Sequence, residues 1–520
     1  MNSVSTKIIQ KIKHPALCFA AGSISVLALP PYGLWFFMLL GLAILYVALA
    51  RTPDKFHSFC CGYAFGFGYF IFGLSWIANA LLVEGNDYAW AWPLAVVGLP
   101  LALSFFTGFA ALFTKMLAPA NAMSHIRGLA AFTVMFSFME WLRSVSFTGF
   151  PWNLYGYGVY DLMALTQIVS VVGIHGLTLF VVFFSASLAF IIINDKPARK
   201  KATMAASLFV LSFLLIVFGH IRALQNPTKL DEATMIRLVQ PNIAQQDKWK
   251  PELALKNLGT LLNLSIADEA NANMNTMIIW PETAIRSVFL DNEGIRNSMQ
   301  DVLKSYKKEA RLISGVLRSQ TSEGQDDIYF NSLMAFDKNL DTTNIYDKFH
   351  LVPFGEYIPF QHFIPLQTVT QFTGFETGSG PQTLKDDFFP SLSPLICYEV
   401  IFPANVKDTK NRPDVLINVT NDGWYGDSNG PHQHFIKARF RAIEEGTPLI
   451  RAANTGISGV IDPIGRIIYA APLMTQSGDN VPLPLKLETE TIFSHFGNIA
   501  FFILISFVGL FWFVPIPKNK

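Results

Sequence analysis

Cys397 stands alone in the polar part of the chain, at the end of the apolar run at residues 393–400, Ser-Pro-Leu-Ile-Cys-Tyr-Glu-Val. Such a run predicts a short buried strand that ends at the thiol, and Glu399 places a carboxylate close behind it. A thiol at a strand end is a candidate nucleophile for acyl transfer. A core cysteine is equally common there, so spacing alone leaves both interpretations open.

A thiol needs a base and a partner for the oxyanion before it can carry acyl chemistry. Glu282 lies in Trp-Pro-Glu-Thr-Ala, directly after the apolar run 277–279, where a strand is expected to emerge into a loop. Pro281 constrains this turn, so the carboxylate could take the thiol's proton. On this motif alone, a solvated acid in a turn is the simpler interpretation.

Residues 346–357, Tyr-Asp-Lys-Phe-His-Leu-Val-Pro-Phe-Gly-Glu-Tyr, contain more aromatic and apolar side chains than an exposed loop usually does. Lys348 and Glu356 could form a partly desolvated pair whose ammonium stabilises an oxyanion. A surface salt bridge is the more frequent use of Lys and Glu. The run 421–426, Asn-Asp-Gly-Trp-Tyr-Gly, has the character of a strand followed by a turn, and it is suited to form a pocket wall around Trp424.

The composition indicates that part of the chain lies in lipid. Of the 520 residues, 51% are hydrophobic and only 15% are charged, whereas soluble proteins carry about 25% charged residues. The net charge of +1 argues against nucleic acid as a partner.

Cys18, Cys60 and Cys61 fall inside strongly apolar segments and are expected to behave as small hydrophobic side chains. His432 and His434 have no third ligand nearby, so we expect no metal site.

Seven apolar segments compatible with crossing a bilayer precede residue 224, and an eighth follows residue 490. They lie at residues 15–29, 33–50, 57–82, 90–117, 128–146, 160–193, 204–223 and 491–514. Basic residues concentrate in alternate loops, most densely at 196–201, on the side shared with the N-terminus. The positive-inside rule therefore predicts that both termini are cytoplasmic and that residues 224–490 lie on the outer face.

Residues 224–490 differ in character, because short β-rich runs alternate there with helix-like stretches. The β-rich runs are 235–239, 277–280, 312–317, 333–336, 395–397 and 415–419, and the helix-like stretches are 250–268, 291–310 and 432–445. This alternation predicts an α/β domain. A loop at 366–380, rich in glycine, has no predicted secondary structure and is long enough to act as a lid.

Four stretches in order resemble the Glu-Lys-Cys signature of the nitrilase superfamily: Trp-Pro-Glu at 280–282, Lys348 in its aromatic loop, Ile-Cys-Tyr-Glu at 396–399, and 421–426. With the membrane segments, essentially the whole chain resembles the bacterial apolipoprotein N-acyltransferases. The resemblance implies a polytopic α-helical membrane domain at 1–223, a periplasmic nitrilase-like αββα sandwich at 224–490, and a C-terminal membrane helix with a cytoplasmic tail at 491–520. It also implies a location in the bacterial inner membrane.

The resemblance further implies a reaction and a role for each residue. Cys397 would take an acyl chain from a phospholipid as a thioester and pass it to the N-terminal diacylglyceryl-cysteine of an apolipoprotein. Glu282 would act as the base and Lys348 would hold the oxyanion, supported by Glu356, Tyr398 and Glu399. Trp249 would line the lipid entrance and Trp424 would contact substrate. The expected donor is phosphatidylethanolamine, surrounded by membrane lipids, with no cofactor, no metal and a monomeric enzyme.

Two other classes of protein fit parts of the pattern. A membrane-anchored carbon-nitrogen hydrolase, an amidase acting on small amides with water, would use the same three residues but needs only one anchoring helix. A transporter with an outer binding domain would show ionisable residues at mid-depth in its spans. Glu140, Arg143, Asp161 and His175 instead fall near span ends, where Arg143 could meet a lipid phosphate. N-acylation therefore accounts for more of the chain.

Overall fold

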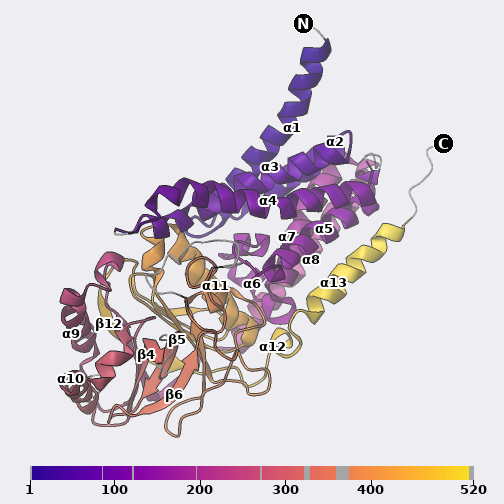
Figure 1. Cartoon of the computed structure of the whole chain (residues 1–520). Coiled ribbons are helices and arrows are strands. Elements are labelled where there is room, and N and C mark those ends of the chain that lie inside the picture. The colour runs from indigo at the N-terminus through magenta and orange to yellow at the C-terminus, as the bar shows by residue number, and fades with distance from the viewer. Residues whose placement is uncertain are drawn as a thin grey trace. The chain divides into compact units, whose positions relative to one another are not determined.

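The computed structural model describes residues 3–84, 86–119, 122–194, 196–269, 272–320, 328–358 and 374–514, with side chains from His14 onwards. The chain divides into two units (Figure 1). The helical unit comprises Met1–Ala78, Ala91–Gln225 and Phe496–Lys520, and the α/β unit comprises Asn79–Trp90 and Asn226–His495. The expected lid at 366–380 falls partly outside the described residues, and its described part, 374–380, has no regular structure.

The helical unit is built from apolar helices: α1 (Ser3–Ser25), α2 (Phe36–Arg51), α3 (Lys55–Leu74), α4 (Trp92–Leu117), α5 (Ile126–Val145), α6 (Met163–Thr166), α7 (Val169–Ile193), α8 (Ala198–Gln225) and α13 (Ile499–Leu510). Within the described ranges, four stretches are long and apolar enough to cross a membrane: Lys55–Leu81, Ala89–Leu117, Val169–Ile193 and Ala198–Gln225. Shorter apolar helices occupy His14–Ala28, Phe36–Arg51 and Ile499–Phe513. The number of crossings stays a prediction.

Two expected spans are not continuous helices. The segment 160–193 contains the short helix α6 before α7 begins at Val169, and Gly173 (φ 66°) kinks α7. The segment 491–514 is divided into α12 (Ile492–Phe496) and α13, with Gly497 (φ 57°) between them. Glycine adopts positive φ without a steric penalty, which interrupts the helix at these points. Hydropathy alone had predicted 491–514 as one span, whereas the length of 160–193 had left room for an additional interfacial piece.

Small residues allow helices of this unit to pack closely. A Cβ atom on Gly62 of α3 would lie 2.4 Å from the carbonyl oxygen of Thr107 on α4. A Cβ atom on Gly22 of α1 would lie 2.0 Å from the carbonyl oxygen of Phe65 on α3. Such approaches are typical of helix pairs in membranes, where small side chains let the backbones meet. Cys18 and Cys61 are buried free thiols in this packing, in agreement with their expected role.

The α/β unit contains two sheets. The larger has the strand order β12-β1-β2-β4-β5-β6, with β3 paired to β4, and the smaller has the order β11-β10-β9-β8-β7. The strands are β1 (Leu230–Gln240), β2 (Asn275–Ile279), β3 (Ile285–Arg286), β4 (Ala310–Gln320), β5 (Ile328–Phe336), β6 (Thr342–Asp347), β7 (Leu392–Ile396), β8 (Val415–Thr420), β9 (Leu449–Ala453), β10 (Gly459–Ile461), β11 (Ile467–Ala470) and β12 (Ser477–Pro484). Each predicted β-rich run overlaps one of these strands, and the runs 277–280 and 395–397 extend one residue beyond β2 and β7.

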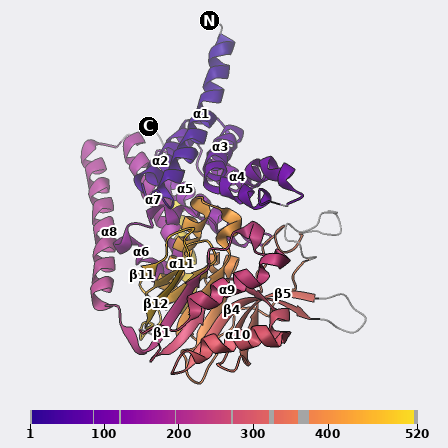
Figure 2. The same ribbon diagram turned by 90° about the vertical axis from the view of Figure 1, so that its left-hand side faces the viewer.

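The alternation of side chains on β2 shows how the layers are built. Met277 and Ile279 pack in the core between the two sheets, whereas Ile278 and Trp280 pack on the opposite face. There they meet α9 (Ala254–Ser265) and α10 (Glu293–Lys304), which lie along that face of the larger sheet (Figure 2). A strand with apolar residues on both faces must be covered on both faces. The helix α11 (Asn429–Glu445) packs on β9 of the smaller sheet, which completes an αββα sandwich.

The parallel strands of both sheets end in the residues that the sequence analysis singled out. β1, β2 and β4 run parallel in one sheet, and β7, β8 and β9 run parallel in the other. Pro394 is tolerated in β7 because β7 is an edge strand and one side of it needs no donor. Glu282 follows β2, Cys397 follows β7, and Asn421 follows β8.

Candidate active site

Cys397 occupies a tight turn directly after β7. It begins the 3₁₀ segment Cys397–Ile401, it is 6% exposed, and its φ is 51°, in the left-handed region that non-glycine residues seldom adopt. The carbonyl oxygen of Cys397 accepts a hydrogen bond of 3.2 Å from Nε2 of His434. Strained backbone of this kind persists only where neighbouring groups hold it, and it is frequent at functional sites.

Glu282 lies in the turn after β2, and its carboxylate has several partners. Oε1 accepts from Asn331 Nδ2 at 2.7 Å, and Oε2 accepts from the backbone N–H of Asn421 at 2.9 Å. The turn lies against β4, since a Cβ atom on Gly315 would come within 2.5 Å of the Glu282 Cα atom. A larger residue at position 315 would displace the carboxylate, so glycine is required for this approach.

Lys348 follows β6 directly and is 1% exposed. Its Nζ atom lies 2.9 Å from Glu356 and 3.5 Å from Oε1 of Glu282. Asn331 Nδ2 donates to Glu356 as well, at 3.0 Å. Burial by itself would lower the pKa of Lys348, but the carboxylates of Glu356 and Glu282 outweigh burial and raise the pKa of the ammonium above its ordinary value. We call Glu282, Asn331, Lys348 and Glu356 the carboxylate network.

The thiol of Cys397 is protonated at neutral pH. Burial is the main cause, and with the negative charge of Glu282 it raises the pKa of the thiol to about 12, although Lys348 acts in the opposite direction. The thiolate is the reactive form of cysteine. The site can therefore use this sulfur as a nucleophile only if a neighbouring base removes the proton as attack occurs.

Glu399 connects the turn of Cys397 to the loop of Lys348. Its Oε2 accepts from the backbone N–H of Ile396 at 2.7 Å, and its Oε1 accepts from Phe349 N–H at 2.8 Å and from the Tyr346 hydroxyl at 2.9 Å. Burial raises the pKa of Glu399 to about 7. One buried carboxyl thus contacts both segments. Glu399 therefore positions the turn of Cys397 relative to the loop of Lys348.

A second group of buried polar side chains supports the thiol turn from its carbonyl side. Nη2 of Arg451 donates to Asp422 at 2.7 Å and lies 2.9 Å from Nδ1 of His434, and all three side chains are fully buried. Burial and the charge of Arg451 lower the pKa of His434 to about 4. Nε2 of His434 donates to the carbonyl oxygen of Cys397, and Nδ1 lies 2.9 Å from Oδ1 of Asp422. We call Asp422, His434 and Arg451 the arginine network.

Sequence reasoning missed several members of these networks. Asn331 lies in mid-strand on β5 and Arg451 on β9, and neither belongs to a recognisable motif. His434 had been considered only as a metal ligand. The N–H of Asn421 shows that the run 421–426 supports Glu282 through its backbone. An Asn or Arg inside an otherwise apolar buried strand is the only local signal for the first two.

Other predicted residues have different surroundings. Tyr398 is 5% exposed and its ring lies 5.7 Å from that of His350 and 5.1 Å from that of Phe402. Trp424 is partly buried in the 3₁₀ turn Asp422–Tyr425. Trp249 is partly exposed and lies against cationic side chains.

The structure does not support a lipid contact for Arg143. It is 1% exposed within the helical unit and forms a two-bond ion pair with Glu140 at 3.0 Å. Nη1 donates to the carbonyl oxygens of Phe150 and Trp152 at 2.6 and 3.0 Å. These protein acceptors already occupy the guanidinium, so a lipid phosphate would have to replace one of them, and the contact stays a prediction.

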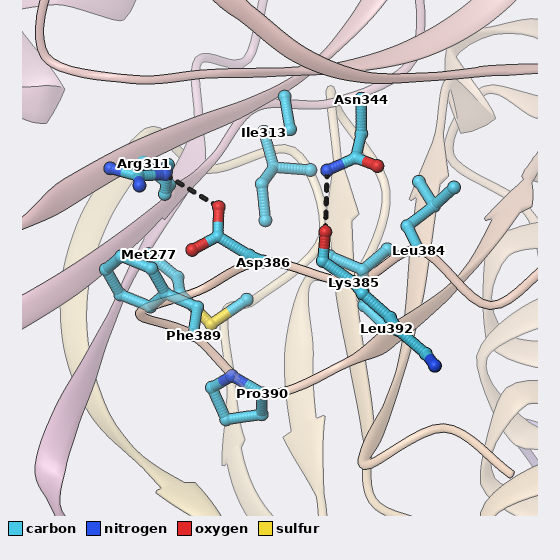
Figure 3. Close-up of a pocket in the computed structure, with 11 residues that line it drawn as sticks. Met277, Arg311, Ile313, Asn344, Leu384, Lys385, Asp386, Phe389, Pro390 and Leu392 are labelled. Atoms are coloured by element: carbon cyan, nitrogen blue, oxygen red, sulfur yellow. Dashed lines mark hydrogen bonds and ion pairs between the residues drawn. The ribbon is translucent and has the colours of Figure 1, made fainter.

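A small pocket lies elsewhere in the α/β unit. Figure 3 shows that it is mainly apolar and that the Arg311–Asp386 ion pair of 2.8 Å lies at its edge. Its lining includes Met277, Arg311 and Leu392, which stand at or near the starts of β2, β4 and β7. Because Glu282 and Cys397 follow the opposite ends of β2 and β7, this pocket does not belong to the candidate active site.

Comparisons with known proteins define the class first. The family model "Carbon-nitrogen hydrolase" matches residues 235–477, and the model "Apolipoprotein N-acyltransferase N-terminal domain" matches residues 21–188. Along the sequence, the chain thus carries a helical membrane domain followed by a nitrilase-like α/β domain, which confirms the expected fold class. A solved amidase from Nesterenkonia sp. is 17% identical to this chain, with a TM-score of 0.35. The match covers 50% of this chain and 94% of the amidase.

Relatives identify the family within this class. An apolipoprotein N-acyltransferase of Rhodopseudomonas palustris is 34% identical over 513 residues, 95% of this chain and 94% of that protein. Another, from Rickettsia prowazekii, is 38% identical over 450 residues, 86% of this chain and 88% of that protein. The chain belongs to the apolipoprotein N-acyltransferase family. This confirms the family expected from the four motifs and, with the four long apolar helices, makes the chain a membrane protein. The matched helical domain argues against the amidase and transporter alternatives.

Proposed function

We propose that the protein transfers an acyl chain from a membrane phospholipid to the N-terminal amine of diacylglyceryl-cysteine on apolipoproteins, through a thioester on Cys397. The observation that carries the mechanism is the buried thiol of Cys397, whose pKa is raised by burial and then by the carboxylate of Glu282, which lies 3.5 Å from Lys348. Family membership supports the overall reaction, and these contacts support the assignment of its residues.

In the first half-reaction, Glu282 takes the thiol proton while sulfur attacks the ester carbonyl of the phospholipid. Lys348 stabilises the negative charge that develops on the carbonyl oxygen. When the tetrahedral intermediate collapses, the carbon–oxygen bond breaks and Glu282 returns its proton to the departing alkoxide. The products are a lysophospholipid and an acyl-thioester on Cys397.

In the second half-reaction, the α-amine of the apolipoprotein attacks the thioester carbonyl. Glu282 removes a proton from the attacking amine, and Lys348 again holds the oxyanion. Collapse breaks the carbon–sulfur bond, and the proton passes to sulfur. The amide product and the free thiol remain, so no other reactant is required.

The remaining predicted residues position this machinery or receive substrate. Glu356 orients Lys348 at 2.9 Å, and Glu399 holds the turn of Cys397 against the loop of Lys348. Tyr398 packs beside the nucleophile with Phe402. Trp249 and Trp424 are partly exposed aromatic side chains suited to the lipid donor.

The membrane arrangement completes the proposal. Phosphatidylethanolamine is the proposed donor, and the enzyme acts as a monomer in the inner membrane. Both termini lie in the cytoplasm, seven spans within residues 1–223 precede the periplasmic catalytic domain at 224–490, and an eighth span follows at 491–520. The alternation of basic residues between loops supports this orientation.

Acyl loading tests the first half-reaction. The purified protein is incubated with phosphatidylethanolamine alone and its intact mass is measured, followed by peptide mapping and hydroxylamine treatment. We expect one acyl chain on the peptide containing Cys397, labile to hydroxylamine, in the wild type and in a Cys60→Ala control. Cys397→Ala should carry none. The absence of an adduct in the wild type, or its survival in Cys397→Ala, would refute the thioester.

A further inference from the structure

Two cationic side chains share one indole ring close to Glu282. Nζ of Lys248 lies 5.4 Å from the ring centroid of Trp249, and the guanidinium carbon of Arg286 lies 5.1 Å from the same centroid. Both distances are within the range of cation–π contacts. We call Lys248, Trp249 and Arg286 the indole–cation group; the proposed acyl-transfer steps leave its two cations unused.

Neither cation forms an ion pair with a carboxylate within the described ranges. Nζ of Lys248 donates to the carbonyl oxygen of Glu282 at 2.9 Å and to the hydroxyl of Thr283 at 2.7 Å, both uncharged acceptors. Arg286, half-buried on β3, has the contact with Trp249 and no ion pair among the residues that the structure covers. Two like charges against one ring repel each other, and an anion between them would relieve that repulsion.

The group is coupled to the reacting residues through Lys248. Its two hydrogen bonds hold the turn that follows Glu282, where Thr283 has a φ of 46°. Burial lowers the pKa of Lys248 to about 8, although the negative charge of Glu282 acts in the opposite direction. Lys248 therefore contacts the turn that carries the proposed base.

A phospholipid has the matching chemistry. Its scissile ester and its phosphodiester are carried by the same three-carbon glycerol unit, so a donor whose ester reaches Cys397 brings a negative phosphate close to the thiol. Arginine binds phosphate with two parallel hydrogen bonds, and lysine binds it as a point charge. The half-exposed indole offers a flat apolar surface for the glycerol carbons.

We propose that the indole–cation group binds the phosphodiester of the acyl donor and thereby selects phospholipids over uncharged esters. This inference rests on the proposed function, because it assumes that a phospholipid acylates Cys397. Arg286 is a specificity residue in this account, and it takes no part in bond breaking. The acceptor amine meets the acyl-enzyme after the lysophospholipid has left the group.

Steady loading kinetics with two donors test the inference. Turnover is measured at a saturating concentration of a diacylglyceryl-cysteine peptide, with monomeric dihexanoyl phosphatidylethanolamine or p-nitrophenyl palmitate, which has no phosphate, as the acyl donor. We expect Arg286→Gln to raise KM for the phospholipid about tenfold, to leave its kcat nearly unchanged, and to leave loading from p-nitrophenyl palmitate at the wild-type rate. Arg286→Lys should restore part of the loss. Lys304→Gln, an exposed residue of α10, is the control for lost charge.

The outcomes separate this inference from the proposed function. If the wild type loads from p-nitrophenyl palmitate but from no phospholipid, the proposed function fails. If the wild type loads from phospholipid and Arg286→Gln has the same KM, only the indole–cation inference fails. A third donor, phosphatidylethanolamine in vesicles, detects attraction to the membrane surface: a rise in KM for the vesicles, with none for the monomeric lipid, would assign Arg286 to that attraction. Equal losses on both donors would mean general damage, and each of these results overturns the inference.

Discussion

The carboxylate network and the arginine network both act on Cys397, but they differ in their balance of charge. In the arginine network, Asp422 is paired with Arg451 at 2.7 Å, and His434 is neutral because burial and Arg451 lower its pKa to about 4. In the carboxylate network, two carboxylates, Glu282 and Glu356, share the ammonium of Lys348. The first network is balanced, whereas the second has a surplus of negative charge.

Because of this difference, the arginine network stabilises the turn of Cys397, and the carboxylate network transfers the proton. Burial opposes the charge of Asp422, but the Arg451 guanidinium holds the pKa of that carboxyl well below its ordinary value, so the arginine network takes up no proton near neutral pH. Its contact with Cys397 is to the backbone carbonyl. The carboxylate network can accept the thiol's proton, because that proton would remove its surplus charge. The predictions below break one network at a time.

The largest effect is expected for Glu282→Gln, because it removes the proposed base and keeps the size of the side chain. General base catalysis contributes about 10²–10⁴-fold in rate, so acyl loading from phospholipid should fall by a factor in that range while the fold stays intact. Loading is followed by intact mass over time. Glu293→Gln, on the exposed first turn of α10, should load normally. A wild-type rate in Glu282→Gln would remove this residue from the base role.

Breaking the arginine network should primarily affect stability. Arg451→Met leaves Asp422 buried without its partner, and removing one member of a buried ion pair costs about 3–5 kcal/mol. We expect a clearly lower thermal unfolding midpoint in detergent, monitored by tryptophan fluorescence. Lys304→Met, at an exposed site, is the control. An unchanged midpoint for Arg451→Met would contradict the proposed structural role.

His434 offers a more selective test of the same network. His434→Phe removes the donor to the carbonyl of Cys397, and a hydrogen bond of this kind contributes about 1 kcal/mol, so loading should slow several-fold with KM unchanged. His434→Gln can still donate to the carbonyl and should recover much of the rate. If Gln and Phe were equally impaired, the hydrogen bond would not be the reason for the effect.

The smallest expected effects are opposite changes in the pKa of the Cys397 thiol, measured from the pH dependence of its alkylation by iodoacetamide. Glu282 stabilises the protonated thiol by its negative charge, so Glu282→Gln should lower the thiol pKa from about 12. Lys348 stabilises the thiolate, so Lys348→Met should raise the thiol pKa. Shifts in the same direction in both variants would contradict the charge balance described above.

The residues in motifs were predictable from the sequence, whereas those that reach the site from distant strands were not. Cys397 and Glu282 follow apolar runs that became β7 and β2, so their positions follow from strand periodicity. Asn331 contacts Glu282 only because β5 pairs with β4, and this pairing is a tertiary fact. The partners of Arg143 were not predictable either, because hydropathy does not show that Glu140 and two carbonyl oxygens occupy its guanidinium.

Membrane segments show the same limit. Hydropathy predicted one span at 491–514, but Gly497 divides that stretch into α12 and α13. A single glycine changes mean hydropathy little, yet its positive φ ends a helix. Average composition therefore predicts where apolar helices occur, and local backbone conformation decides how long each one is.

The most direct test of the account is the fate of the acyl chain on preloaded enzyme. Protein acylated with phosphatidylethanolamine is freed of donor and mixed with a diacylglyceryl-cysteine peptide that has a free α-amine. We predict that the acyl mass leaves the Cys397 peptide and appears on the added peptide as a hydroxylamine-resistant amide, whereas the N-acetylated control peptide accepts none. Release of the chain as free fatty acid, with no amide formed, would contradict acyl transfer and support a hydrolase.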